Sequence, residues 1–104
     1  MYIVTKRGKG KAPKTGTKVT VHYTGSFLNG QVFASSFKRG KPIVFVVGTG
    51  RVIRGWDEAF LMMKKGEKRT LIIPPDLAYG SRGAGGVIPP NSWLVFKVEL
   101  ISFK

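Results

Sequence analysis

Alternating apolar and polar residues predict two β-strands in this 104-residue chain. In residues 18–23 the apolar side chains of Val19, Val21 and Tyr23 alternate with polar ones, which is the period-two pattern of a half-buried strand. Residues 93–103 repeat this pattern. Four apolar residues share one face of that second strand: Leu94, Phe96, Val98 and Leu100. Both segments are therefore expected to lie in a sheet with one buried face.

Turn residues and β-branched runs predict the other strands. Asn29-Gly30 is the strongest two-residue hairpin signal in the chain, so the backbone is expected to reverse there before residues 31–36. Residues 43–47 are β-branched and aromatic and predict a buried strand. Residues 67–73 predict another strand, and the short apolar start at residues 2–4 brings the expected number to five or six.

One segment has the periodicity of a helix. Its apolar residues fall at positions i, i+3, i+4 and i+7, namely Trp56, Ala59, Phe60 and Met63. Asp57 and Glu58 are expected in its first turn, where the helix dipole favours acids. Lys64 and Lys65 are expected in its last turn, and Gly66 after them supplies a stop. The sequence thus predicts a single helix.

The order of these elements predicts an α+β fold. Strands and helices do not alternate, which excludes a parallel doubly wound sheet. An antiparallel sheet packed on one helix is the natural arrangement, because one helix covers only one face. Residues 1–104 are expected to form a single domain, with a basic strand and loop at residues 1–16. The long glycine-rich loop at residues 76–92 is expected to be functional.

Basic residues dominate the charge of the chain. Lys plus Arg number 18 against 5 for Asp plus Glu, a net charge of +13, and residues 6–18 carry six cations without an anion. An ordinary hydrated, charged face is the favoured interpretation of such a charge run, and attraction of polyanions is the alternative. No apolar run reaches the ~18 residues that span a bilayer, and no signal-peptide pattern is present. We expect a cytoplasmic monomer, with the nucleus or a processed secreted domain as alternative locations.

The common catalytic and metal-binding patterns are absent from the sequence. The chain has no cysteine and a single histidine, His22, on the polar face of a strand. A nucleophilic triad therefore lacks its base, and a metal site lacks its ligands. No cofactor is expected. The aromatic residues (7 Phe, 3 Tyr and 2 Trp) gather near strand ends and loops, where they form either ordinary core or an apolar ligand pocket.

Several strings together closely resemble the FK506-binding protein (FKBP) family of peptidyl-prolyl cis-trans isomerases. They are Val21-His22-Tyr23-Thr24-Gly25, Phe33, Val52-Ile53-Arg54-Gly55-Trp56-Asp57, Pro75-Asp76-Leu77-Ala78-Tyr79-Gly80, and Ile88-Pro89-Pro90. The resemblance runs from about Gly16 to Leu100. It implies a twisted antiparallel sheet wrapped around a short helix, with a pocket between them. It also implies isomerisation of X-Pro bonds in proline-containing peptides or proteins, and binding of FK506- and rapamycin-type macrolides.

The resemblance also implies which residues form the pocket. Trp56 would be its floor. The other pocket positions of the family correspond to Tyr23, Phe33, Phe45 and Phe96 as walls, Val52 and Ile53 on the rim, Val87 and Ile88 in a flap loop, and Ile43 at the edge. The backbone N–H of Ile53 and the hydroxyl of Tyr79 would donate to ligand carbonyls. The catalytic candidates are Tyr23, Phe33, Ala34, Tyr79 and Phe96, with no metal ion.

One position departs from the family pattern. Directly after Phe33, family members usually have an aspartate that pairs with the tyrosine at the position of Tyr23 and with a nearby arginine. Here the residue is Ala34, whose methyl group makes neither contact. We therefore expect reduced isomerase turnover and somewhat weaker macrolide binding. The alternative is a catalytically weak binding module that docks on an acidic partner or nucleic acid through its basic surface.

Overall fold

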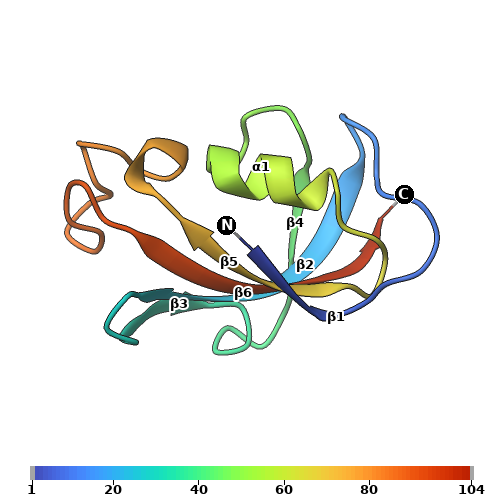
Figure 1. Cartoon of the computed structure of the whole chain (residues 1–104), viewed down its shortest axis with the longest axis horizontal. Coiled ribbons are helices and arrows are strands. Elements are labelled where there is room, and N and C mark those ends of the chain that lie inside the picture. The colour runs from blue at the N-terminus through green and yellow to red at the C-terminus, as the bar shows by residue number, and fades with distance from the viewer. Residues whose placement is uncertain (1, 104) are drawn as a thin grey trace.

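The computed structural model describes residues 2–103, which form an antiparallel sheet with a short helix lying across one face (Figure 1). The strands are β1 (Tyr2–Lys6), β2 (Lys18–Phe27), β3 (Val32–Ser35), β4 (Ile43–Val46), β5 (Lys68–Ile73) and β6 (Leu94–Phe103). The helix α1 spans Arg54–Phe60 and a 3-10 turn spans Pro75–Leu77. The strand order is β1-β5-β6-β2-β3, and β4 pairs with β2. The α+β class, six strands and one helix confirm the predicted fold class.

The Asn29-Gly30 turn forms the β2–β3 hairpin where the sequence predicts it. Gly30 has φ 91°, a left-handed conformation that glycine adopts without strain. Its N–H donates to the carbonyl of Phe27 (2.9 Å), and the N–H of Gln31 donates to Asn29 Oδ1 (2.9 Å). The hairpin brings β3 to the edge of the sheet beside the long central strand β2.

The buried face of the sheet and α1 share one hydrophobic core. All four apolar residues predicted on one face of the last strand are buried: Leu94, Phe96, Val98 and Leu100. Val19 and Val21 of β2 have no exposed surface, and Trp56, Ala59 and Phe60 of α1 pack against them in the same cluster. The apolar face predicted for the strands and the apolar face predicted for the helix therefore pack against each other in a single core. Within residues 2–103, no helix is long and apolar enough to cross a membrane.

The helix is shorter than its periodicity predicts. α1 ends before Lys64 and Lys65, so these two lysines do not lie in its last turn. Met63 is fully buried in the core although it follows the helix. The carbonyl of Met62 accepts a hydrogen bond from Arg69 Nη2 (3.3 Å), a tertiary contact that replaces a further helical turn. A contact with β5 therefore shapes the chain where the sequence pattern predicts more helix.

A second segment also differs from its prediction. Residues 43–47 were expected to be a buried strand, but β4 pairs only with β2 and the Val44 side chain is 60% exposed. β-branched residues suit an edge strand with one covered face as well as a buried strand, so this run does not reveal how deeply it lies. The loop at residues 76–92 is partly ordered by its own hydrogen bonds, since Ala84 N–H donates to the Ile88 carbonyl (2.9 Å) and Ile88 N–H donates back (3.1 Å).

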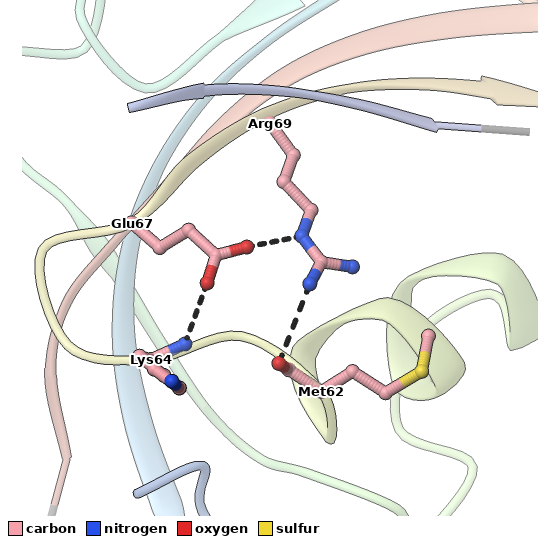
Figure 2. Close-up of polar contacts among 4 residues, drawn as sticks. All are labelled: Met62, Lys64, Glu67 and Arg69. Carbon is pink, nitrogen blue, oxygen red and sulfur yellow. Dashed lines mark hydrogen bonds and ion pairs between the residues drawn. The ribbon is translucent and has the colours of Figure 1, made fainter. Parts of the chain in front are cut away.

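A buried ion pair joins β5 to the turn that follows α1. Glu67 and Arg69 are 5% and 6% exposed, and Arg69 Nε donates to Glu67 Oε2 (Figure 2). The other carboxylate oxygen of Glu67 accepts from the backbone N–H of Lys64 (3.1 Å). Tyr2 stacks over the guanidinium with 4.1 Å between its ring centroid and Cζ. The pair thus holds β1, β5 and the turn together.

A second carboxylate braces the loop that leads into α1. Asp57 Oδ1 accepts from Gly48 N–H and Asp57 Oδ2 accepts from Gly50 N–H, both at 2.9 Å. Each glycine has a positive φ (77° and 76°), so the loop makes two turns that few other residues would allow. Asp57 therefore fixes the path of the chain immediately before Val52 and Ile53.

Removing the buried carboxylate of Glu67 is expected to destabilise the fold strongly. In the Glu67→Gln variant the buried Arg69 guanidinium loses its counter-charge, and the free energy of unfolding should fall by about 3–5 kcal/mol. Urea unfolding measures this change. The matched control is Glu58→Gln, which removes an exposed pair with Arg54 (3.8 Å) and should cost about 0–1 kcal/mol. Equal effects of the two substitutions would contradict the structural role of the buried pair.

Replacing Asp57 by asparagine is expected to loosen the loop at residues 48–53. The amide presents a donor to one of the two glycine N–H groups, so the free energy of unfolding should fall by about 1.5–3 kcal/mol. Hydrogen exchange should show faster exchange at Gly48 and Gly50. Asp76→Asn, a substitution of an exposed acid, is the control. Unchanged exchange at the two glycines would count against the brace.

Candidate active site

A cavity of about 230 Å³ lies between the sheet and the start of α1. Its lining residues come from β2, β3, β4, β6, α1 and the two long loops: Tyr23, Phe33, Ala34, Ile43, Arg51, Val52, Ile53, Trp56, Tyr79 and Phe96. Nine of these ten are residues that the sequence singled out. The tenth, Arg51, carries no pattern that separates it from the other 17 cations of the chain. Only the fold shows that it borders the cavity.

Trp56 forms the base of the cavity and is only 4% exposed. Three aromatic rings of the sheet and helix meet it at an edge: Tyr23 at 5.0 Å between centroids, Phe96 at 5.3 Å and Phe60 at 5.5 Å. Edge-to-face contacts of this kind add to the free energy gained from burial. Because the indole is held from several sides, the base of the cavity is rigid. Its Nε1 has no hydrogen-bond partner within residues 2–103.

The absence of a side chain at Gly25 lets two wall residues meet. A Cβ atom at this position of β2 would lie 2.7 Å from Phe96 Cε1 and 2.8 Å from Phe33 Cζ. The rings of Phe33 and Phe96 pack edge to face with centroids 5.7 Å apart, in the space that a larger residue would occupy. Gly25 therefore shapes the wall of the cavity although it does not line it.

Tyr79 brings a hydroxyl group to the mouth of the cavity. Its side chain is 39% exposed, and it comes from the loop after the 3-10 turn. Burial raises the pKa of Tyr79 above its ordinary value of 10.0, and the nearby Tyr23 raises it further. The hydroxyl of Tyr79 thus stays protonated at neutral pH and is available as a hydrogen-bond donor.

Ala34 gives the cavity a methyl group where the family usually has a carboxylate. It lies on β3 opposite Gly25 in the β2–β3 register, and it lines the cavity together with Tyr23 and Arg51. The hydroxyl of Tyr23 makes no hydrogen bond within residues 2–103, although this side chain packs closely on Trp56. Two polar groups that could bind an acid therefore border the same cavity as Ala34.

Three of the residues proposed for the pocket lie outside the cavity lining. Phe45 packs behind Trp56, with centroids 5.9 Å apart, and against Phe60 at 5.6 Å. Ile88 is 5% exposed and belongs to the core, while Val87 beside it is 58% exposed at the molecular surface. Their order in the sequence does not reveal these different depths.

A larger groove of about 420 Å³ occupies the other face of the sheet. Most of its lining residues have polar or charged side chains, among them three threonines, Lys68, Lys97 and Glu99. His22 lies there, with its Nδ1 2.8 Å from Ser36 Oγ and its ring stacked on Phe37 at 4.4 Å. The smaller cavity remains the candidate active site, because its rigid aromatic base and convergent hydroxyl groups are typical of ligand pockets.

Comparison with known proteins agrees with this geometry. The profile of the family described as FKBP-type peptidyl-prolyl cis-trans isomerase matches residues 9–101. FK506-binding protein 1 from Dictyostelium discoideum is 58% identical over 97% of this chain and 94% of its own length. Peptidyl-prolyl cis-trans isomerase Fkbp12 from Drosophila melanogaster is 57% identical over 86% of this chain and 82% of its own.

Solved structures share the same fold. The crystal structure of AtFKBP13 superposes with a TM-score of 0.94 at 44% identity, covering 99% of this chain and 91% of the other. The crystal structure of FkpA from Escherichia coli superposes with a TM-score of 0.91 at 48% identity, covering 99% of this chain and 47% of FkpA. With a family profile matched over most of its length and relatives this similar, the chain belongs to the family of FKBP-type peptidyl-prolyl cis-trans isomerases.

Proposed function

We propose that the chain isomerises X-Pro bonds in the cavity over Trp56, and that its turnover is reduced by Ala34. The observation that carries the proposal is the cavity itself, a rigid aromatic hollow of about 230 Å³ with one charged lining residue, Arg51. A prolyl ring is apolar, and aromatic walls suit it. The isomerase name of the Drosophila relative supports the same activity.

The chemistry needs no general base. Rotation about an X-Pro bond is slow because amide resonance must be broken, at a barrier of about 18–20 kcal/mol. In the twisted transition state the carbonyl and the nitrogen are less dipolar than in the planar amide. Apolar walls that exclude water therefore favour the twisted form over the planar one. The lining of the cavity, with no histidine or carboxylate among its residues, suits this mechanism.

Two hydrogen-bond donors would orient the substrate. The backbone N–H of Ile53 donates to no acceptor within residues 2–103, and it lies at the rim directly before α1. The hydroxyl of Tyr79 is the second donor. These two donors would hold substrate carbonyls while the X-Pro bond rotates. Fixed donors of this kind act without reorganisation during the reaction.

We also propose that the cavity binds macrolides of the FK506 type. Its volume lies below the ~300–1,000 Å³ of sites that enclose a whole drug-sized ligand. One ring of the macrolide would therefore occupy the cavity, which Ile43 lines, while the rest lies outside it on the molecular surface. The name FK506-binding protein 1 of the Dictyostelium relative supports this ligand class.

The lower turnover follows from the missing carboxylate. An aspartate at position 34 would face Tyr23 and Arg51, and it would add a negative charge next to the substrate carbonyl carbon. Ala34 has only a methyl group, so this polar contribution to catalysis is missing. The contribution of the apolar walls remains. We therefore infer an enzyme that depends mainly on its apolar walls.

Restoring the carboxylate should raise the activity. We expect Ala34→Asp to increase kcat/KM several-fold on a short Leu-Pro peptide in a protease-coupled assay, because the new acid pairs with Tyr23 and Arg51. Ala34→Asn is the matched control, with the same shape and no charge, and should give a smaller gain. No change, or a loss, with Ala34→Asp would refute the role assigned to this position.

Removing the hydroxyl of Tyr79 should weaken macrolide binding. One lost hydrogen bond costs about 0.5–1.5 kcal/mol, so Tyr79→Phe should raise the Kd for FK506 by about two- to tenfold, measured by calorimetry. Between pH 7 and pH 9 the wild-type affinity should stay constant, because the raised pKa keeps Tyr79 protonated. Tyr2→Phe, a change outside the cavity, is the control. If Tyr79→Phe left the Kd for FK506 unchanged, Tyr79 would not be the proposed hydrogen-bond donor.

The same assays separate the isomerase from a pure binding module. Turnover near the uncatalysed rate together with tight macrolide binding would identify a module whose pocket only binds. Measurable turnover that FK506 inhibits would identify the enzyme. Absence of both would overturn the proposed function.

A further inference from the structure

Two basic segments far apart in the sequence meet at one end of the sheet. Lys6 lies opposite Lys68 in the β1–β5 register. Lys9 forms an isolated antiparallel bridge with Lys65, and its N–H donates to the Lys65 carbonyl at 3.0 Å. We call the six exposed cations of these segments the cation cluster: Lys6, Arg7, Lys9, Lys64, Lys65 and Lys68.

A glycine makes this close approach of the two segments possible. A Cβ atom at Gly8 would lie 2.6 Å from the carbonyl oxygen of Lys65, 2.8 Å from that of Lys64 and 2.9 Å from the N–H nitrogen of Glu67. The two backbones thus touch where no side chain intervenes. Figure 1 shows the end of β1 and the loop between α1 and β5 on the same side of the molecule.

The acids near the cluster do not neutralise it. Glu67 lies between two of its lysines in sequence, but its carboxylate is buried against Arg69 and the Lys64 N–H (Figure 2). Glu99 lies opposite Lys68 in the β5–β6 register but makes no ion pair within 4 Å among residues 2–103. Like charges placed opposite each other across strands are destabilising. The fold therefore concentrates positive charge that an external anion would relieve.

We propose that the cation cluster binds the phosphate backbone of nucleic acid without reading its sequence. Lysines dominate the cluster, and a lysine binds phosphate as a point charge. No aromatic residue belongs to the cluster, so base stacking and base-edge contacts have no place in it. A chain of phosphates matches several cations at once, which a single anion does not. The overall charge of +13 favours the same partner.

An anionic bilayer is the less suitable partner. Tyr2, Ile3 and Val4 of β1 are exposed beside the cluster, but they lie in a strand of five residues. Binding at a membrane surface typically uses the longer apolar face of an amphipathic helix. The cluster also lies on the side of Figure 1 away from β3 and the loop at residues 76–92, which contribute Phe33 and Tyr79 to the cavity. A bound nucleic acid would leave the cavity open to a proline-containing chain.

Fluorescence anisotropy with a labelled 20-nucleotide single-stranded RNA of mixed sequence tests the proposal. The slope of log K against log salt is about −0.7 per phosphate contacted, so four to six contacts predict a slope of about −3 to −4. Lys9→Glu/Lys65→Glu should weaken binding by at least about tenfold. The matched control is Lys38→Glu/Arg82→Glu, which makes the same charge change at exposed loop positions outside the cluster and should have a much smaller effect.

A single variant separates lost binding from lost folding. Lys9→Glu places an acid opposite Lys65, which should maintain or raise Tm because it replaces a like-charge pair by an opposite-charge pair. The same substitution should weaken RNA binding. Weaker binding at an unchanged or higher Tm is therefore the outcome that supports the cluster as the contact surface.

Several outcomes would overturn the proposal. They are no RNA binding at 50 mM salt, a shallow salt slope, or equal losses in the cluster and control variants. Tighter and cluster-dependent binding to vesicles that contain phosphatidylserine would assign the surface to membranes. None of these measurements depends on isomerase activity, so they stand apart from the test of the cavity.

Discussion

The edge-to-face packing of aromatic rings around Trp56 is the contact on which the structure depends. The indole is the largest side chain that α1 buries, and it meets rings from β2, β4 and β6 as well as Phe60 one turn away. The same contacts fix α1 against the sheet and make the base of the cavity. Core and candidate site are thus one aromatic cluster, and a change that loosens the core also deforms the cavity.

Small residues and carboxylates around this cluster determine its shape. Gly25 leaves room for the rings of Phe33 and Phe96, and Asp57 holds the loop that brings Ile53 to the rim. Gly25 and Asp57 add no apolar side chain to the cluster, yet they determine where its apolar side chains lie. The proposed mechanism, in which shape and exclusion of water act in place of proton transfer, would depend on this precise placement.

The few acids of the chain serve the fold more than they balance its charge. Asp57 binds two backbone N–H groups, Glu67 binds the buried Arg69, and Glu58 pairs with Arg54 on the surface of α1. Among residues 2–103, most Lys and Arg side chains therefore make no ion pair within 4 Å and are exposed to solvent. A surface of this kind attracts anions over distances of about a Debye length.

The sequence by itself determined the class of fold, five or six strands and the β2–β3 turn, and its resemblance to the FKBP family indicated nine of the ten residues that line the cavity. These follow from local rules and from the family motifs, because periodicity and turn chemistry act over a few residues. Only the tertiary structure decided that α1 stops before Lys64, that Val44 is exposed, that Phe45 lies behind Trp56 and that Arg51 borders the cavity. These features depend on contacts between segments far apart in the chain, which no local pattern encodes.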